Sequence, residues 1–345
     1  MPENKYVQQN EYVQEYLQYG GQAIIEGVMM RSPSYYSVAC RTPEGNIVSI
    51  TEKIEKTWIG KQSLLKKPFL RGSFAIFDSM ALGSKAMKFA SRIQLASEEK
   101  DKAEVSSKKD VQSGAIATTM VIGIAIGLFL FDFIPNYLAE QLTRFGVTSG
   151  TLKNLATEIL KIIFFIGYIS LISLMPEIKR VFMYHGAEHK SINALEALEP
   201  LDEEHALKQT RLHPRCGTSF AIIVLMISLL FFTFVPRYPL EEMGYSLPLI
   251  LNVLVRVAVE IILLPIVTGV AYELLRYAGR MRNQKYVMLL FKPGLWSQYL
   301  TTREPDRAQI EVALVALTNV IDAEKNGIAE TKLSSHGERL SNVVG

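Results

Sequence analysis

Long blocks of apolar residues alternate with charged stretches along the chain, and four of these blocks are close to 20 residues long. They run from about Gly114 to Leu138, Leu155 to Met175, Gly217 to Val235 and Leu247 to Val270. A helix needs about 20 mainly apolar residues to cross the ~30 Å hydrocarbon core of a bilayer. The pattern therefore predicts a mainly α-helical membrane protein with about four transmembrane helices.

Lysine and arginine residues gather beside one end of each predicted span. They are frequent before the first span, between the second and third, and after the fourth, whereas the other two loops hold only Arg144, Lys153 and Arg237. Cytoplasmic loops of membrane proteins are rich in Lys and Arg. We therefore expect a multi-pass protein whose two termini and long second loop, residues 176–217, lie in the cytoplasm.

Shorter patterns before the first span predict a small cytosolic α/β part. Residues 23–30 and 36–41 are rich in β-forming side chains, Pro43–Asn46 has turn composition, and residues 47–54 alternate apolar with polar positions. These signals indicate a small sheet with a hairpin at Pro43–Asn46. Residues 71–93 have helical periodicity. The apolar face available on that helix consists of Phe74, Phe77, Met80, Ala81 and Met87.

The expected domain boundaries follow from these patterns, and a second amphipathic helix is predicted at residues 303–325. The expected parts are a cytosolic N-terminal α/β part (1–96), a charged linker (97–113), a four-helix membrane domain (114–275) with its cytosolic loop (176–217), a cytosolic C-terminal segment (276–328) with the amphipathic helix, and a disordered tail (329–345).

Composition narrows the classes of function. The net charge is only +3 over 345 residues, and no basic stripe stands apart from acidic neighbours, so no nucleic-acid partner is indicated. Cys40 and Cys216 are both expected on the cytosolic side, where thiols stay reduced, so no structural disulfide is predicted. The expected partners are the lipid bilayer and a membrane-proximal substrate or protein.

The stretch His185–His189 reads H-x-x-E-H and lies in the second cytosolic loop. On a helix, two histidines four residues apart share one face, so their imidazoles can bind one divalent metal ion, for which zinc is the expected identity. Glu188 lies beside the second histidine, where a carboxylate can orient or deprotonate a bound water. The same order of residues is the inverted-zincin pattern. The alternative for both histidines is hydrogen bonding to backbone or lipid phosphate, and for Glu188 a surface ion pair.

A metal held by His185 and His189 needs at least one further protein ligand. His213 lies in a turn that returns to the membrane face where the motif helix begins, and Glu273 leaves the fourth span on the same side. We expect His213 or Glu273 to complete the ligand set. Cys216 is an alternative ligand, although a small buried side chain is its simpler interpretation.

The fourth predicted span contains two charged residues, Arg256 and Glu260, four positions apart. Charges inside a bilayer are costly and face a partner or a water-filled cavity. The simpler interpretation is an ion pair that holds the helix bundle together, and the alternative is a path for a substrate or a proton.

Four segments carry a resemblance to a known family. They are Gly20–Arg31 (GGQAIIEGVMMR), Tyr184–Lys190 (YHGAEHK), His213–Ser219 (HPRCGTS) and Thr302–Pro305 (TREP). In combination they resemble the YqhQ-like family of bacterial multi-pass membrane proteins, which share a domain of unknown function. The resemblance implies a bacterial cytoplasmic membrane location. Similar proteins are described as predicted metal-dependent enzymes, which for this chain implies roles for His185, Glu188 and His189.

These features lead to one favoured function and two alternatives. The favoured hypothesis is a metal-dependent, hydrolase-like enzyme with its site at the cytosolic membrane face, acting on a lipid-linked or peptide substrate. The first alternative is a non-catalytic membrane scaffold or assembly factor, in which the histidine loop forms a surface for a partner. The second alternative is a small transporter that uses Arg256 and Glu260.

Overall fold

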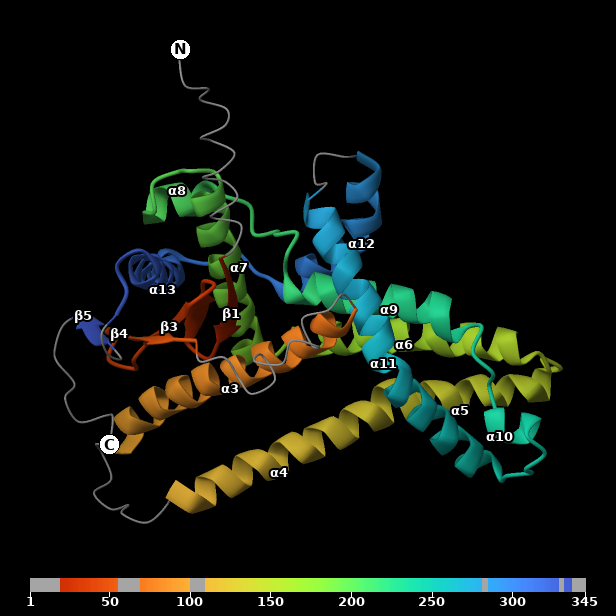
Figure 1. Cartoon of the computed structure of the whole chain (residues 1–345). Coiled ribbons are helices and arrows are strands. Elements are labelled where there is room, and N and C mark those ends of the chain that lie inside the picture. The colour runs from red at the N-terminus through yellow and green to blue at the C-terminus, as the bar shows by residue number, and fades with distance from the viewer. Residues whose placement is uncertain (1–18, 55–68, 100–108, 281–284, 329–331, 337–345) are drawn as a thin grey trace.

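The computed structural model describes residues 19–54, 69–99, 109–280, 285–328 and 332–336, and the chain is mainly helical (Figure 1). In chain order the elements are β1 (Gly20–Ile24), β2 (Gly27–Arg31), β3 (Tyr35–Arg41), β4 (Ile47–Lys53), α3 (Leu70–Glu99), α4 (Lys109–Leu128), the π-helical turn η2 (Phe129–Phe133), α5 (Ile134–Glu140), the 3-10 turn η3 (Gln141–Phe145), α6 (Gly150–Ile172), α7 (Pro176–Glu196), α8 (Glu203–Lys208), α9 (Gly217–Phe232), α10 (Pro239–Glu242), α11 (Leu249–Arg280), α12 (Lys285–Thr301), α13 (Arg307–Asn326) and β5 (Lys332–His336).

The strands form one antiparallel sheet in the order β1-β2-β3-β4-β5. The predicted hairpin is confirmed, because β3 pairs with β4 through a turn in which the Thr42 N–H donates to the Asn46 carbonyl over 2.8 Å. Gly45 has a φ of +92°, which glycine adopts without steric cost. Residues 332–336 correct a prediction, since they lie in the expected disordered tail but pair with β4 as a fifth strand.

The sheet is covered on both faces, and side chains of alternating direction fill the two cores. Val28 and Met30 face α7 and α13, while Met29 and Cys40 face α3. Figure 1 shows α13 on one side of the sheet and α3 on the other. The predicted C-terminal amphipathic helix is therefore confirmed as α13, and it shares one core with the N-terminal strands and the motif helix α7.

Helix α3 buries a different face from the one predicted. Leu82, Ala86 and Ala90 pack against the sheet, while Phe77 and Met80 are 59% and 54% exposed. Small residues allow the helix axis to approach the strands closely, and the larger apolar side chains then remain outside. The face with the bulkiest apolar residues is therefore not the face that contacts the sheet.

Three helical segments in the described residues are long and apolar enough to cross a bilayer: Val121–Phe145, Gly150–Ile172 and Leu249–Leu274. The remaining predicted span, Gly217 to Val235, corresponds to α9, which ends at Phe232 after 16 residues. At 1.5 Å per residue α9 is about 24 Å long, less than the ~30 Å hydrocarbon core. A count of four spans therefore stays a prediction.

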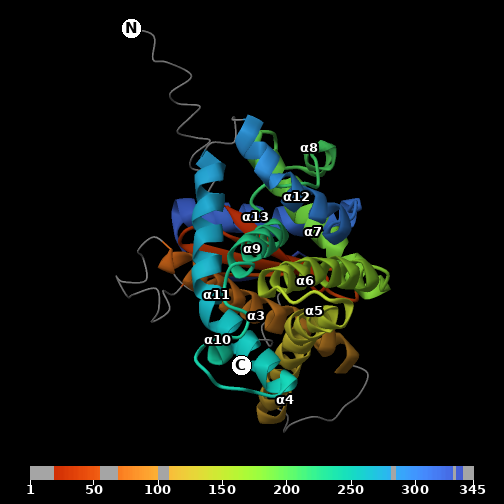
Figure 2. The ribbon, with the colours of Figure 1, turned by 90° about the vertical axis from the view of Figure 1, so that its right-hand side faces the viewer.

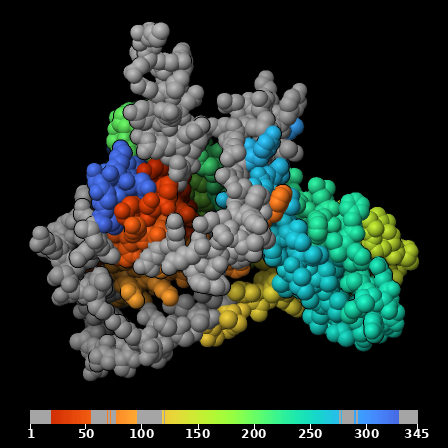
Figure 3. Space-filling model, viewed as in Figure 1, coloured from red at the N-terminus to blue at the C-terminus, as the bar shows by residue number. Residues whose placement is uncertain are grey.

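Helix α9 packs against α6, α11 and α12, and Figure 2 shows it between α6 and α12. The sequence did not predict α12. Its Gly294 allows the close approach, since a Cβ there would lie 3.0 Å from the Ser219 side chain, and the Ser219 hydroxyl donates to the Gly294 carbonyl over 2.9 Å. In Figure 3 the sheet, in red and orange, and the helices α9 and α11, in green and cyan, form two neighbouring parts of the surface.

Charged side chains lie buried among the apolar helices. We call this set the ion cluster, and it consists of Asp132, Glu158, Lys161, Arg256 and Glu260. The predicted Arg256–Glu260 pair forms over 2.7 Å, and Lys161 contacts Asp132 over 2.7 Å and also contacts Glu260. Asp132 lies in the π-helical turn η2, a distortion of the kind that changes the direction of a side chain.

Candidate metal centre

Helix α7 carries the histidine pair. Pro176 occupies its first turn, where the missing backbone N–H costs no helical hydrogen bond. His185 and His189 project from one face, and their ring centroids are 4.4 Å apart. His189 is only 1% exposed, whereas His185 is half-buried. The helix therefore presents two adjacent imidazoles at a buried position.

Backbone carbonyls determine which ring nitrogen of each histidine carries the proton. His185 Nδ1 lies 2.8 Å from the Thr301 carbonyl oxygen, and His189 Nδ1 lies 2.6 Å from the Arg211 carbonyl oxygen. A carbonyl oxygen can only accept a hydrogen bond, so each Nδ1 carries the hydrogen and donates it. Both Nε2 atoms are left with lone pairs, which is the arrangement that metal-binding histidines adopt.

Cys216 brings a third donor atom to the same place. It is the residue that precedes α9, where helical N–H groups favour a negative charge. Its Sγ lies 3.2 Å from His185 Nε2 and 3.1 Å from the Thr218 hydroxyl. Burial alone raises the pKa of the Cys216 thiol, but the contact with His189 and the hydrogen bonds from Thr218 outweigh burial and lower the pKa overall.

The spacing of these three donors fits a single cation. We call His185, His189 and Cys216 the metal centre, and one donor atom from each lies within 4.8 Å of the others. With Zn–N and Zn–S bonds of about 2.0 Å and about 2.3 Å, the nitrogen and sulfur of a tetrahedral zinc site lie roughly 3.5 Å apart. Burial lowers the pKa of His189, which favours the neutral imidazole that can donate a lone pair to a metal. The residues present therefore suit a divalent zinc-type ion and leave one coordination position without a protein donor in this set.

Glu188 belongs to α7, and its side chain lies against strand β1. It is 5% exposed, and a Cβ at Gly21 would lie 2.9 Å from its Cγ, so only a glycine allows this approach. Burial raises the pKa of Glu188 to about 7; the charge of His185 and the Gly21 N–H partly oppose that rise. A carboxylate with this pKa can both accept and release a proton near neutral pH.

A cavity of about 680 Å³ adjoins the metal centre. His185, Glu188, His189 and Cys216 all line it, and residues of strand β1, which packs against α7, also form part of its wall. Its volume lies within the usual range of small-molecule sites, roughly 300–1,000 Å³. The three donors and the carboxylate are therefore open to a common space large enough for a small molecule.

The loop after α8 is fixed to α7 by two residues that the sequence interpretation did not select. Lys190 donates to the carbonyls of Leu207 and Gln209 over 2.9 Å and 2.8 Å, and Asn193 donates to the Thr210 carbonyl over 2.8 Å. These bonds hold the loop where the next carbonyl, that of Arg211, meets His189. Lys190 and Asn193 belong to no metal-ligand motif. Only their positions, one and four residues after His189, indicated that they would lie near the site.

The two other predicted ligands lie outside the group of donors. His213 is buried beside Glu196, with its Nε2 3.4 Å from the carboxylate, and its ring centroid is 5.6 Å from that of His189. Glu273 accepts a hydrogen bond from the Phe69 N–H over 3.3 Å. Among the described residues, the structure therefore brings Cys216 to the histidine pair in place of His213 or Glu273.

The four segments that carry the family resemblance converge at this site. Gly21 belongs to the first, the H-x-x-E-H stretch to the second and Cys216 to the third. The fourth segment passes under α7, where the Arg303 N–H donates to the Phe182 carbonyl over 2.8 Å and a Cβ at Gly186 would lie 2.1 Å from the Arg303 oxygen. Segments more than a hundred residues apart in sequence thus build one site.

Known proteins match most of the chain. Residues 67–323 match the family described as "Protein of unknown function (DUF1385)". The chain is 37% identical over 311 residues to the uncharacterized protein YqhQ of Bacillus subtilis (strain 168), an alignment that covers 89% of this chain and 93% of that protein. No solved structure matches it. The family match spans more than half of the sequence, and the protein therefore belongs to the DUF1385 family.

Proposed function

We propose that this protein is a metal-dependent enzyme of the bacterial cytoplasmic membrane that activates water at the cytosolic membrane face. The observation that carries the proposal is the convergence of His185, His189 and Cys216 on a cavity that Glu188 also lines. Each histidine contacts a backbone carbonyl through Nδ1, which leaves Nε2 as the metal donor, and His185 Nε2 lies 3.2 Å from Cys216 Sγ. A divalent cation held there would polarise a substrate and lower the pKa of a water.

The roles of the protein groups follow from their positions. His185, His189 and Cys216 hold the cation, and Glu188 takes a proton from the attacking water and returns it to the leaving group. The oxygen of that water forms the new bond to the substrate carbon or phosphorus as the bond to the leaving group breaks, which is a hydrolysis. Such a role needs the carboxylate beside the cavity, and Glu188 lines it.

The membrane arrangement is part of the proposal. Both termini and the 176–217 loop lie in the cytoplasm, because Lys and Arg residues gather beside those ends of the apolar helices. The three apolar helices long enough to cross a bilayer support a multi-pass protein. The proposal counts the shorter apolar helix α9 as a fourth span, because only an even number of spans places both termini on the same side. The sheet, α7 and α13 then form the cytosolic part, and the metal centre lies where that part meets the membrane.

Metal analysis of the purified full-length protein tests the metal centre. We expect about one zinc per chain, and loss of that zinc in the double variant His185→Ala, His189→Ala. The matched control is His205→Ala on α8, where the ring contacts Asp202 over 2.8 Å away from the metal centre. Protein without stoichiometric divalent metal, or a double variant that keeps it, would overturn the proposal.

Cobalt substitution tests the individual roles. Replacement of zinc by cobalt(II) should give a thiolate-to-cobalt charge-transfer band that disappears in Cys216→Ser. Glu188→Gln should keep the metal but change the pH dependence of the cobalt spectrum, because the neighbouring base that interacts with the bound water is gone. An unchanged spectrum in Cys216→Ser would exclude the thiolate as a ligand, and an unchanged pH profile in Glu188→Gln would exclude the carboxylate as the base.

A further inference from the structure

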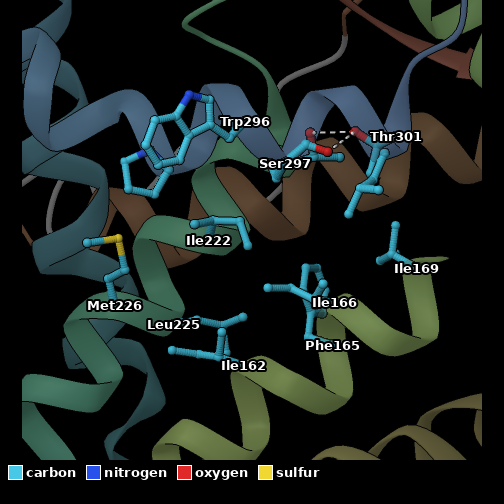
Figure 4. A pocket seen from close by; sticks show the side chains of 13 residues that line it. Ile162, Phe165, Ile166, Ile169, Ile222, Leu225, Met226, Trp296, Ser297 and Thr301 are labelled. Atoms are coloured by element: carbon cyan, nitrogen blue, oxygen red, sulfur yellow. Dashed lines mark hydrogen bonds between the residues drawn. The ribbon is translucent and has the colours of Figure 1, made fainter.

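An apolar groove opens between α6, α9 and α12 close to the metal centre. It has a volume of about 290 Å³. Apolar side chains from all three helices line it, as Figure 4 shows, among them Ile162, Ile166, Ile222, Leu225, Met226 and Trp296. Trp296, at one side of the groove, is 63% exposed. Helix α6 is long and apolar enough to cross a bilayer and α9 is a shorter apolar helix, so in a membrane the groove would lie beside the hydrocarbon core.

One end of the groove meets the metal centre. Thr218 lines both the groove and the polar cavity. Its hydroxyl lies 3.1 Å from Cys216 Sγ and 3.2 Å from the Thr301 hydroxyl, and the Thr301 carbonyl accepts the hydrogen bond from His185. The apolar groove and the polar cavity therefore share a wall, and residues that contact the proposed ligands form it.

The depth of the groove matches one leaflet of a bilayer. Along α9 the lining extends from Thr218 to Met226, and the eight steps between these residues rise about 12 Å at 1.5 Å each. Half of the hydrocarbon core is roughly 15 Å thick. A hydrocarbon chain in the groove would therefore run from the membrane face toward the bilayer centre without leaving one leaflet.

The polar cavity suits an anionic head group. Arg31 on β2 and Arg215 before α9 line it together with the metal centre. Arg215 also pairs with Glu196, which holds its guanidinium at the cavity wall. Guanidinium groups bind phosphate oxygens with good geometry, and a divalent cation at His185 and His189 would add positive charge. A lipid with an acyl chain and a phosphate-bearing head group would fit both the groove and the cavity.

We propose that the groove binds one acyl chain of a bilayer phospholipid whose phosphate-bearing head group enters the cavity at the metal centre. This inference rests on the proposed function and names its substrate class: the bond to be hydrolysed lies in the head-group region of a membrane phospholipid. The lipid enters sideways from the leaflet on the side of the metal centre, because the groove opens toward the bilayer.

Photolabelling in vesicles tests the groove without an activity measurement. The full-length protein is placed in phosphatidylethanolamine–phosphatidylglycerol vesicles that contain a trace of phosphatidylglycerol with a diazirine at the end of one acyl chain. After illumination, adducts are mapped by mass spectrometry. We expect more adducts at residues 162–166 and 222–226 than on the lipid-facing side of α11 around Ile262, which is 72% exposed. A second probe with the diazirine on its head group should label residues 181–189.

Two variants of α9 make the test specific to the groove. Leu225→Trp fills the groove, and Leu230→Trp adds the same side chain on the same helix at an exposed position outside it. Displacing even two methylene groups should lower occupancy roughly tenfold, so adducts at 222–226 should fall by about that factor in Leu225→Trp only. Zinc content should be the same in both variants.

The outcomes separate the lipid site from the proposed function. Adducts spread evenly over all lipid-facing helices, or groove adducts that persist in Leu225→Trp, would overturn the lipid site while leaving the metal centre intact. Head-group adducts away from residues 181–189 would overturn the head-group placement. Groove adducts on a protein that contains no metal would keep the acyl-chain site and overturn the proposed enzyme.

Discussion

The ion cluster and the metal centre are both sets of buried polar side chains, but their charges are arranged in opposite ways. In the ion cluster, cations face carboxylates: Lys161 lies 2.7 Å from Asp132, and Arg256 lies 2.7 Å from Glu260. In the metal centre, three electron-pair donors face one another with no cationic side chain among them. The first arrangement pairs opposite charges within itself, whereas the second becomes favourable when a cation is added.

The ion cluster is bonded to neighbouring helices, whereas the metal centre is open to a cavity. Arg256 donates to the carbonyls of Phe232 and Pro236 at 3.0 Å and 2.9 Å, so its guanidinium ties α11 to the end of α9. The metal centre instead lines a cavity of about 680 Å³. Buried charges in an apolar bundle thus indicate helix-to-helix attachment here, whereas converging donors beside an open space provide what the proposed metal site requires.

Removing one cation should have the largest effect. Lys161→Met leaves the carboxylates of Asp132, Glu158 and Glu260 around an uncharged side chain. Breaking a buried ion network by removing one partner costs about 3–5 kcal/mol. We expect a correspondingly lower thermal unfolding temperature and poor recovery from the membrane. The control is Lys208→Met on α8, whose exposed pair with Glu204 should matter little. Wild-type stability in Lys161→Met would show that the ion cluster is not a structural element.

Metal removal should have the next largest effect, and it acts on the other region. Zinc at about 100 times its dissociation constant stabilises a folded protein by about 2.7 kcal/mol. We expect a chelator to lower the unfolding temperature of the wild type and to leave that of the double variant His185→Ala, His189→Ala unchanged. Equal sensitivity of both proteins to the chelator would place the bound metal outside the metal centre.

A smaller effect is expected from one methyl group on α7. In Gly186→Ala the new Cβ would meet the Arg303 carbonyl oxygen at 2.1 Å, so α7 must move away from the segment that includes Thr301, the partner of His185. Overpacking of this kind costs about 1–3 kcal/mol. Both unfolding temperature and zinc content should fall. The matched control is Gly167→Ala on α6, where nothing lies within 4 Å of the added Cβ. Equal behaviour of the two variants would show that α7 tolerates displacement.

Local sequence patterns were sufficient for elements that depend on their own periodicity or turn residues. The β3–β4 hairpin follows from the turn Pro43–Asn46, and α13 follows from its apolar spacing. The adjacency of His185 and His189 follows from helix geometry alone. In each case the information lies within about one turn or one helix of the chain.

Features that depend on distant contacts were missed or left open. Cys216 was only an alternative to His213 and Glu273 as the third ligand, because no local pattern shows that α9 begins at the histidine pair. The buried face of α3 was missed because small residues, rather than the largest apolar ones, allow contact with the sheet. Strand β5 has a short polar sequence, and only β4 gives it a hydrogen-bonding partner.

The two cysteines allow the comparison at the level of single side chains: Cys40 is an ordinary buried residue, and Cys216 is a proposed metal ligand. Cys40 lies between the sheet and α3, where burial, aided by the charge of Glu26, raises the pKa of its thiol well above the usual value. Cys216 is equally buried, but its contact with His189 and the hydrogen bonds from Thr218 outweigh that burial and lower its pKa. In metal-free protein at neutral pH, we expect iodoacetamide to modify Cys216 at least about tenfold faster than Cys40, since the thiolate is the reactive form.

Zinc should abolish this difference, because a bound cation occupies the sulfur lone pair that attacks the reagent. The rates are followed by mass spectrometry of the two cysteine peptides, with Cys216→Ser as the control that leaves only the slow reaction. Equal rates for the two thiols would mean that the neighbours of Cys216 do not favour its thiolate. Modification of Cys216 at an unchanged rate in the presence of zinc would mean that its sulfur is not a ligand, and the metal centre would then need a different third donor.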